Sequence, residues 1–261
     1  MPYKVNEPVE PQQRAVIDDD QLKRMMADSQ PSFFERNRYR LLALIAINVA
    51  VFALEAVLSG MRIDISTRTL VDMGAMYAPL VQSPADLYRF VTPMFLHMDL
   101  MHLGFNMVAL YSVGEVLERT LGKGSYLALY FIAGITGNAV SYAADVLLGG
   151  GSAVSAGAST SVFGLFVAVA LLAVLHKGNR SLFTQYSKGM LGVIAVNVAY
   201  TLLVPNISVS GHLGGALGGL VAMFMIPAAS LRVPNPVRVV VAVLWVAALV
   251  WLLVSQGVLG V

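Results

Sequence analysis

Residues 157–164 read Gly-Ala-Ser-Thr-Ser-Val-Phe-Gly and open an apolar segment that continues to residue 175. Residues 149–156 before it are small and uncharged, which is typical of a flexible loop that leads into a helix. Ser159 is therefore expected in the first turn of that helix. The N–H groups there have no intrahelical partner and carry the positive end of the helix dipole. This stretch predicts a membrane helix that begins with a serine hydroxyl beside free hydrogen-bond donors.

The composition is that of a helical membrane protein. Of the 261 residues, 57% are hydrophobic and 12% are charged, which is about half of the charged share of a soluble domain. The apolar runs are about 20 residues long and do not alternate, which disfavours a transmembrane β-barrel. A net charge of +2 gives no basis for nucleic-acid binding, and the absence of cysteine excludes a thiolate metal site.

Seven apolar segments follow a polar tail, residues 1–40. They are expected near residues 41–59, 98–117, 125–148, 157–175, 189–204, 211–228 and 238–257. Each is close to the length that a helix needs to cross a bilayer. The sequence therefore predicts an all-α polytopic membrane protein.

The basic residues predict the orientation of these segments. Of the 17 Lys and Arg residues, 14 lie in the tail or in connections on the same side as the tail. The positive-inside rule then places the N-terminus in the cytoplasm and, after seven spans, the C-terminus outside. The second, fourth and sixth segments run inward from the outer face. His97 and His102, Ser159, and His212 lie at the starts of these three segments, so all four residues are expected at similar depth.

A serine becomes a nucleophile when a neighbouring base accepts its proton. Neutral His212 is a suitable base for Ser159. The acids at comparable depth are Asp99, Asp145 and Glu55, and nothing in the sequence ties one of them to the histidine. We therefore expect a Ser–His dyad.

Other groups near this depth are suited to stabilising an oxyanion. His102 and Asn106 are four residues apart and share one helix face, and both can donate hydrogen bonds. Together with the N–H of Ser159 they are expected to form an oxyanion hole. Gly157 permits close approach of a substrate backbone. His97 lies at the mouth of the helix that carries His102.

The dyad requires contact between the fourth and sixth segments. Gly211, Gly215 and Gly219 form a stripe of small residues, which allows the backbones of two membrane helices to approach closely. Phe163, one turn after the serine, is expected to pack against the ring of His212.

As a set, these residues resemble the rhomboid family of intramembrane serine proteases, and the resemblance covers about residues 41–230 in the right order. Glu118, followed by Gly122, is similar to an acidic position at the inner end of the family's second helix. Tyr88-Arg89 resembles the Trp-Arg element of its first loop. The motifs that carry the resemblance are His97-x4-His102-x3-Asn106, Gly157-Ala158-Ser159 and Gly211-His212-x2-Gly215-x3-Gly219.

The resemblance implies a particular architecture. Residues 41–230 would form a six-helix core with a short, central fourth helix, and residues 231–261 a connection and an additional seventh transmembrane helix. The polar tail would be cytoplasmic. The loop 61–90 would lie partly in the membrane, and the fifth helix with the loop 205–210 would help to gate entry. A bacterial cell membrane is the expected location.

The resemblance also implies a chemistry that uses no cofactor and no metal. Ser159 would attack a peptide carbonyl, with His212 as general base and then acid, and water would hydrolyse the acyl-enzyme. His102, Asn106 and the Ser159 N–H would hold the oxyanion. Substrates would be single-span membrane proteins cut near the outer face. The family commonly has Gly after the nucleophile where this chain has Thr160, which puts sequence preference in doubt. The oligomeric state is left open.

Other interpretations explain less. A transporter would carry polar residues through the membrane and repeated halves, and a zinc protease a His-Glu-x-x-His motif. A retinal-type receptor needs a lysine in its last segment, and residues 238–257 contain none. The main alternative is a catalytically silent relative that binds transmembrane clients. Arg89 and Glu118 are expected to be structural anchors, one of a loop and the other of an inner helix end.

Overall fold

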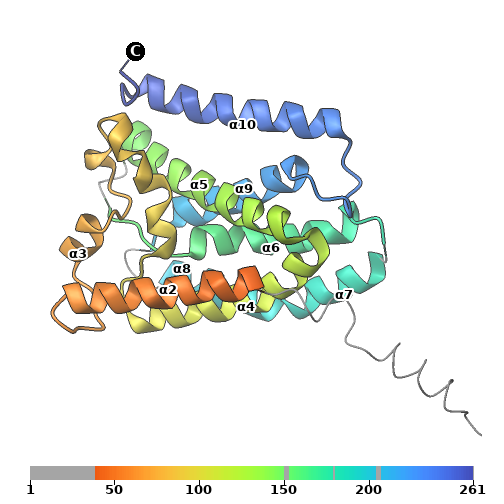
Figure 1. Cartoon of the computed structure of the whole chain (residues 1–261), viewed down its shortest axis with the longest axis horizontal. Helices are drawn as coiled ribbons and strands as arrows, with labels where there is room; N and C mark the ends of the chain where they lie inside the picture. Colours follow the sequence, from red (N-terminus) through yellow and green to blue (C-terminus); the bar gives the residue numbers. More distant parts are fainter. Residues whose placement is uncertain (1–38, 150–152, 179, 204–206, 261) are drawn as a thin grey trace, which may run out of the picture. The chain divides into compact units, whose positions relative to one another are not determined.

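The computed structural model describes residues 39–149, 153–178, 180–203 and 207–260, so most of the expected tail lies outside the described residues. The described chain is helical (Figure 1). The α-helices are α2 (Tyr39–Leu58), α3 (Thr67–Asp72), α4 (Leu100–Leu121), α5 (Lys123–Leu148), α6 (Ser159–Leu175), α7 (Arg180–Gly189), α8 (Leu191–Leu203), α9 (Val209–Met225) and α10 (Asn235–Ser255). The 3-10 helices are η1 (Ala78–Leu80), η2 (Pro84–Phe90) and η3 (Thr92–Phe95).

The predicted all-α polytopic fold is confirmed. Within the described ranges, α2, α4, α5 and α10 are long and apolar enough to cross a membrane. Helices α6 and α9 are apolar but have 17 residues each. At 1.5 Å per residue each is about 26 Å long, which is less than the roughly 30 Å of a hydrocarbon core. Each predicted apolar segment corresponds to one of these helices or to α8.

The charged connection ahead of the fifth predicted segment is largely helical. It forms α7, and the chain bends by 42° before it continues as α8. Phe183 of α7 is buried against the core, and the Tyr186 hydroxyl donates to the carbonyl of Ser112 on α4. Arg180 and Lys188 lie on a polar surface of the same helix. One packed face therefore makes this charged connection helical.

Helix α6 lies at the centre of the main hydrophobic cluster and contacts α4, α5 and α9. Its contact with α9 is a contact between backbones. A Cβ at Gly215 would overlap the carbonyl of Thr160, and a Cβ at Gly219 would overlap that of Gly164. The predicted stripe of small residues on α9 thus sets the separation of these two helices.

Loop elements between α2 and α4 are fixed to the core by buried polar groups. The Arg89 guanidinium donates to the carbonyls of Val71 at 3.0 Å and Ala75 at 2.9 Å. Asn138 of α5 donates to the carbonyl of Phe90 at 2.9 Å. An antiparallel bridge between Met76 and Ser155 joins this loop to the segment that leads into α6. The loop therefore holds the approach to Ser159 in place.

At the start of α2, the Glu118 carboxylate accepts the backbone N–H groups of Arg40 and Leu41, each at 3.0 Å. These N–H groups belong to the first turn, where intrahelical partners are lacking. The structural roles expected for Arg89 and Glu118 agree with these contacts.

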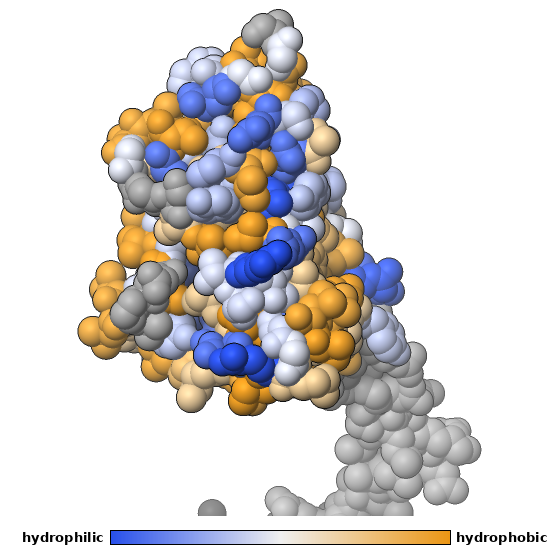
Figure 2. Space-filling model, turned by 90° about the vertical axis from the view of Figure 1, so that its left-hand side faces the viewer, coloured by the Kyte–Doolittle hydropathy of each residue, from blue (hydrophilic) through white to orange (hydrophobic). Residues whose placement is uncertain are grey.

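Figure 2 shows the end of the molecule at which α3 and the loop elements lie. Hydrophilic side chains gather across the middle of this face, and hydrophobic side chains lie on both flanks. Exposed apolar side chains are also frequent along α2 and α10. This division is expected for a protein whose ends meet water and whose sides meet lipid.

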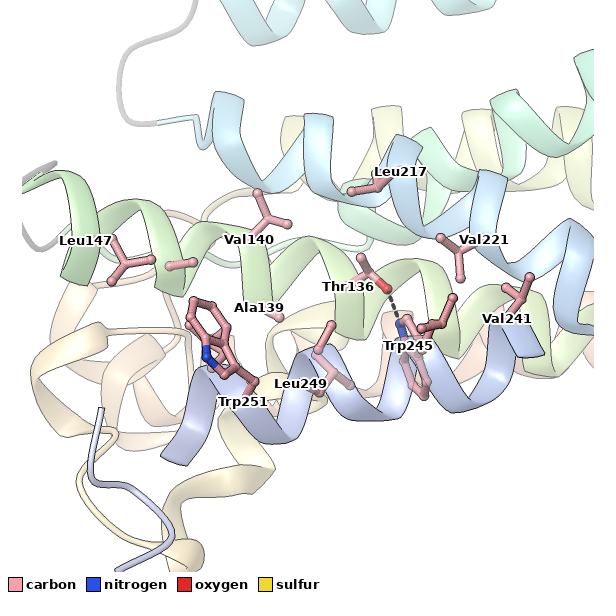
Figure 3. A pocket seen from close by; sticks show the side chains of 14 residues that line it. Thr136, Ala139, Val140, Leu147, Leu217, Val221, Val241, Trp245, Leu249 and Trp251 are labelled. Carbon is pink, nitrogen blue, oxygen red and sulfur yellow. Dashed lines mark hydrogen bonds between the residues drawn. The ribbon is translucent and has the colours of Figure 1, made fainter. Parts of the chain in front are cut away.

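Helix α10 runs beside α9 and α5 and leaves an apolar cleft between them (Figure 3). Near the middle of α10, the Trp245 indole N–H donates to the Thr136 hydroxyl of α5 at 2.9 Å. Towards its end, Leu252 is buried in a small cluster that includes Tyr142 of α5. Helix α10 is thus attached to the core at a few points.

Candidate active site

Ser159 and His212 form the centre of the candidate site. Ser159 is the first residue of α6, and His212 lies in the first turn of α9. The Ser159 Oγ and the His212 Nε2 are 2.6 Å apart, within hydrogen-bonding distance. Phe163 stacks on the imidazole with a centroid distance of 4.3 Å and an angle of 8° between the rings. The two residues, 53 positions apart in sequence, thus meet where α6 and α9 begin.

The other nitrogen of His212 has a partner that the sequence analysis did not identify. Its Nδ1 lies 2.8 Å from the Thr201 hydroxyl of α8. The same hydroxyl donates to the carbonyl of Asn197 at 2.8 Å. A threonine in an apolar helix gives little signal in a sequence, and the spacing of four from Asn197 indicates at most a bond within the helix.

Gly157 has a φ of 136°, a conformation that side chains disfavour. A Cβ at this position would also lie 2.8 Å from the His102 ring. The glycine therefore lets His102 approach the start of α6. A small cavity results, and the residues that line it are His102, Ser155, Ala156, Ser159, Thr160, Ile207, Ser208 and His212.

His102 lies in the first turn of α4, where Asp99 caps the helix by accepting the His102 backbone N–H at 2.7 Å. The N–H of Met98 points at the His102 Nδ1 at 3.5 Å. This leaves Nε2, which faces Gly157, as the ring nitrogen that carries a proton. The structure therefore brings a donor from His102 to the cavity that Ser159 lines.

Asn106 occupies a different position. Its side-chain amide is buried and donates to the carbonyl of His102 at 2.9 Å, one turn earlier in α4. It does not line the small cavity. Of the two side chains expected in an oxyanion hole, the structure thus places His102 at the cavity and Asn106 behind it.

His97 lies in the loop before α4 and is completely buried. Its backbone N–H donates to the Glu55 carboxylate of α2 at 3.1 Å. Its ring meets the His102 ring edge-on at 5.2 Å. Burial, and secondarily the nearby His102, holds the pKa of His97 well below its usual range, so the ring is neutral. His97 therefore shapes the wall behind His102.

Thr160, which stands where the resemblance leads one to expect glycine, directs its side chain into the helix packing. Its methyl group lies against Gly137 of α5 and Gly211 of α9. A Cβ at Gly137 would be 2.7 Å from the Thr160 Cβ. The missing side chain at Gly137 thus provides the space that Thr160 fills.

Comparison with known proteins agrees with this arrangement. Residues 84–229 match the family described as the Rhomboid domain. The chain is 35% identical over 192 residues to the rhomboid protease GluP of Bacillus subtilis, an alignment that covers 73% of this chain and 34% of that protein. It is 35% identical over 138 residues to the putative rhomboid protease YdcA of the same organism, covering 53% of this chain and 66% of that protein.

Similarity extends to eukaryotic proteins. The chain is 36% identical over 155 residues to rhomboid-like protease 3 of Toxoplasma gondii, which covers 59% of this chain and 56% of that protein. The chain thus spans between a third and two thirds of the length of these relatives. The Rhomboid domain match extends over more than half of the chain and includes every residue of the candidate site. The protein is therefore a member of the rhomboid family, with the several apolar helices of an integral multi-pass membrane protein.

Proposed function

We propose that this protein is an intramembrane serine endopeptidase in which Ser159 is the nucleophile and His212 the base. The observation that carries the proposal is the 2.6 Å contact between the Ser159 Oγ and the His212 Nε2, inside a helix bundle. The names of the relatives, rhomboid proteases, support the same reaction class. The alternative of a silent client-binding protein gains nothing from a site that holds both groups in contact.

The reaction begins with attack of the Ser159 Oγ on the carbonyl carbon of the scissile peptide bond, while the His212 Nε2 takes the hydroxyl proton. The imidazolium then gives this proton to the leaving amine as the carbon–nitrogen bond breaks. Next, Nε2 takes a proton from a water molecule, whose oxygen attacks the acyl ester. Return of that proton to the Ser159 Oγ releases the carboxylic acid and restores both residues.

The oxyanion of each tetrahedral intermediate needs donors that point at it before it forms. The N–H of Ser159 belongs to the first turn of α6, and the His102 Nε2 faces the cavity. We assign both to this role. Asn106 uses one amide N–H within α4, and its second N–H is the one we assign to the oxyanion.

The substrate class follows from where the site lies. The cavity is at the start of α6 and α9, both too short to span a hydrocarbon core alone, so the site is recessed within the bundle. Single-span membrane proteins, cut near the outer face of a bacterial cell membrane, are the proposed substrates. The proposed orientation has the N-terminus in the cytoplasm and the C-terminus outside. Residues 41–230 would be the catalytic core, with α10 as an addition.

Cleavage of a tagged single-span substrate in proteoliposomes, with mass-spectrometric mapping of the cut, tests this proposal. Wild-type protein is expected to cut near the outer boundary of the span, and Ser159→Ala and His212→Ala to lose cleavage while staying folded. Ser161→Ala is the matched control, because the Ser161 hydroxyl lies against Gly134 of α5, and it should remain active. Binding of the span without any cut would favour the client-binding alternative, and cleavage by Ser159→Ala would refute the assigned nucleophile.

A further inference from the structure

The contact between Thr201 and His212 joins α8 to the candidate base. Thr201 is the residue of α8 that packing buries among its described positions 191–203, and its hydroxyl lies 2.8 Å from the His212 Nδ1. The residue before it, Tyr200, stacks on the His102 ring with a centroid distance of 6.3 Å and an angle of 24°. Consecutive residues of α8 thus contact both histidines of the cavity.

The hydrogen bonds of Thr201 determine which nitrogen of His212 carries the proton. A hydroxyl has one hydrogen to donate, and Thr201 donates it to the carbonyl of Asn197 at 2.8 Å. Towards the His212 Nδ1 the oxygen can then only accept. Nδ1 must therefore carry the hydrogen of the neutral ring.

This assignment fixes the other side of the ring. With the hydrogen on Nδ1, Nε2 has a free lone pair, and it lies 2.6 Å from the Ser159 Oγ. The serine hydroxyl donates to Nε2, as proton transfer from a nucleophile requires. In the other tautomer Nε2 would be a donor and could not accept the proton of Ser159.

We propose that Thr201 is a positioning residue, which fixes the tautomer and the ring orientation of His212 and so takes the place of the acid in a three-residue arrangement. The inference rests on the proposed function of Ser159 and His212. Because the Thr201 oxygen accepts from Nδ1–H in the neutral ring and in the imidazolium alike, the contact persists through the proton transfers. A hydroxyl carries no charge, so its contribution is orientation rather than charge compensation.

Substitution with valine removes the acceptor and keeps the shape of the side chain. For Thr201→Val, kcat is expected to fall about 10- to 100-fold with KM within about twofold of wild type, since a general base contributes factors of roughly 10² or more. Thr201→Ser, which retains the hydroxyl, should recover kcat to within about threefold. Labelling of Ser159 by a fluorophosphonate, which needs no peptide substrate, should slow in Thr201→Val by the same factor as kcat.

Thr136→Val is the matched control. Thr136 is also buried, also donates to a carbonyl four residues earlier, and also accepts an N–H from another helix, that of Trp245 (Figure 3). It lies outside the cavity. This variant should lose a comparable structural bond and keep the wild-type kcat.

A measurement on wild-type protein removes any dependence on the folding of variants. The chain has four histidines, so nitrogen NMR of protein labelled at histidine is tractable, with His212 assigned by its loss in His212→Ala. The expected result is a neutral ring protonated at Nδ1. A ring protonated at Nε2, full kcat in folded Thr201→Val, or failure of Thr201→Ser to recover activity would overturn the proposal. Cleavage by Ser159→Ala would instead refute the proposed function, so the two failures are distinguishable.

Discussion

Helices α9 and α10 are both apolar, yet the molecule uses them differently. The 21-residue α10 is the more hydrophobic, with a mean hydropathy of 2.7, and only 6% of its span is buried. The shorter α9 lies in the core and carries His212, with four buried glycines against α5 and α6. Apolar side chains gain little by moving from lipid into protein, whereas small residues let helix backbones approach closely. Glycine spacing, rather than hydrophobicity, thus separates the core helix from the peripheral one.

The same packing sets the geometry of the site. Backbone contact between α6 and α9 at Gly215 lies one turn below the Ser159–His212 pair. A change in the separation of these helices would be transmitted directly to the distance between Oγ and Nε2. Helix α10 touches neither residue, and its cleft is lined by α5, α9 and α10 itself.

The largest effect is expected from a methyl group at the α6–α9 contact. In Gly215→Ala the new Cβ would overlap the Thr160 carbonyl, so the helices must separate, at a cost of about 3 kcal/mol. Activity should fall by about 100-fold or more, since a shift of about 1 Å at a reacting group has that consequence. Thermal unfolding in detergent and substrate cleavage measure both quantities.

Gly104→Ala is the control for this substitution, because no heavy atom lies within 4 Å of a Cβ at Gly104. Its stability should equal or exceed that of wild type by up to about 1 kcal/mol. If Gly215→Ala unfolds at the wild-type temperature, the claim that backbone contact holds α9 in the core is wrong.

A second, smaller effect concerns the order of unfolding. Both tryptophans, Trp245 and Trp251, lie in α10, so their emission reports on this helix while circular dichroism reports on all helices. We expect the emission to change at a lower temperature than the helical signal, because α10 is attached at few points. Leu252→Ala, which empties a buried position, should lower the first transition and leave the second in place.

Val243→Ala serves as the comparison for Leu252→Ala, since Val243 is exposed on the same helix. It should shift neither transition. A single coincident transition in wild type would show that α10 is as firmly packed as α9, against the distinction drawn between them.

The smallest effect is expected for Trp245→Phe, which removes the hydrogen bond to Thr136. Hydrogen bonds between membrane helices contribute about 0.6 kcal/mol on average. The unfolding temperature should fall slightly and cleavage should stay unchanged, with exposed Trp251→Phe as the control. A loss of activity similar to that of Gly215→Ala would mean that α10 controls the site.

The sequence predicts the helix order and the meeting of Ser159 with His212 well. Motif spacing identifies the candidate groups, and the distribution of basic residues predicts that they lie at one depth. The small-residue stripe on α9 predicts which helices touch. These features depend on residue type and period, which a sequence displays directly.

Contacts to the backbone or to lone hydroxyls are not displayed in that way. Glu55 has no evident partner in the sequence because its partner is the backbone N–H of His97. Thr201 resembles any threonine of a membrane helix until α8 is placed beside His212. The direction of the Asn106 amide depends on a competing carbonyl one turn away. The helical form of the charged connection α7 comes from tertiary packing of Phe183.

The central claim, that His212 activates Ser159, is tested most directly by covalent labelling. Wild-type protein in mild detergent is incubated with a fluorophosphonate, digested, and analysed by mass spectrometry for the modified residue. The account predicts one phosphonyl adduct, on Ser159, with labelling lost in Ser159→Ala and slowed by at least about 100-fold in His212→Ala. An adduct on another serine, or equal labelling rates in wild type and His212→Ala, would contradict it.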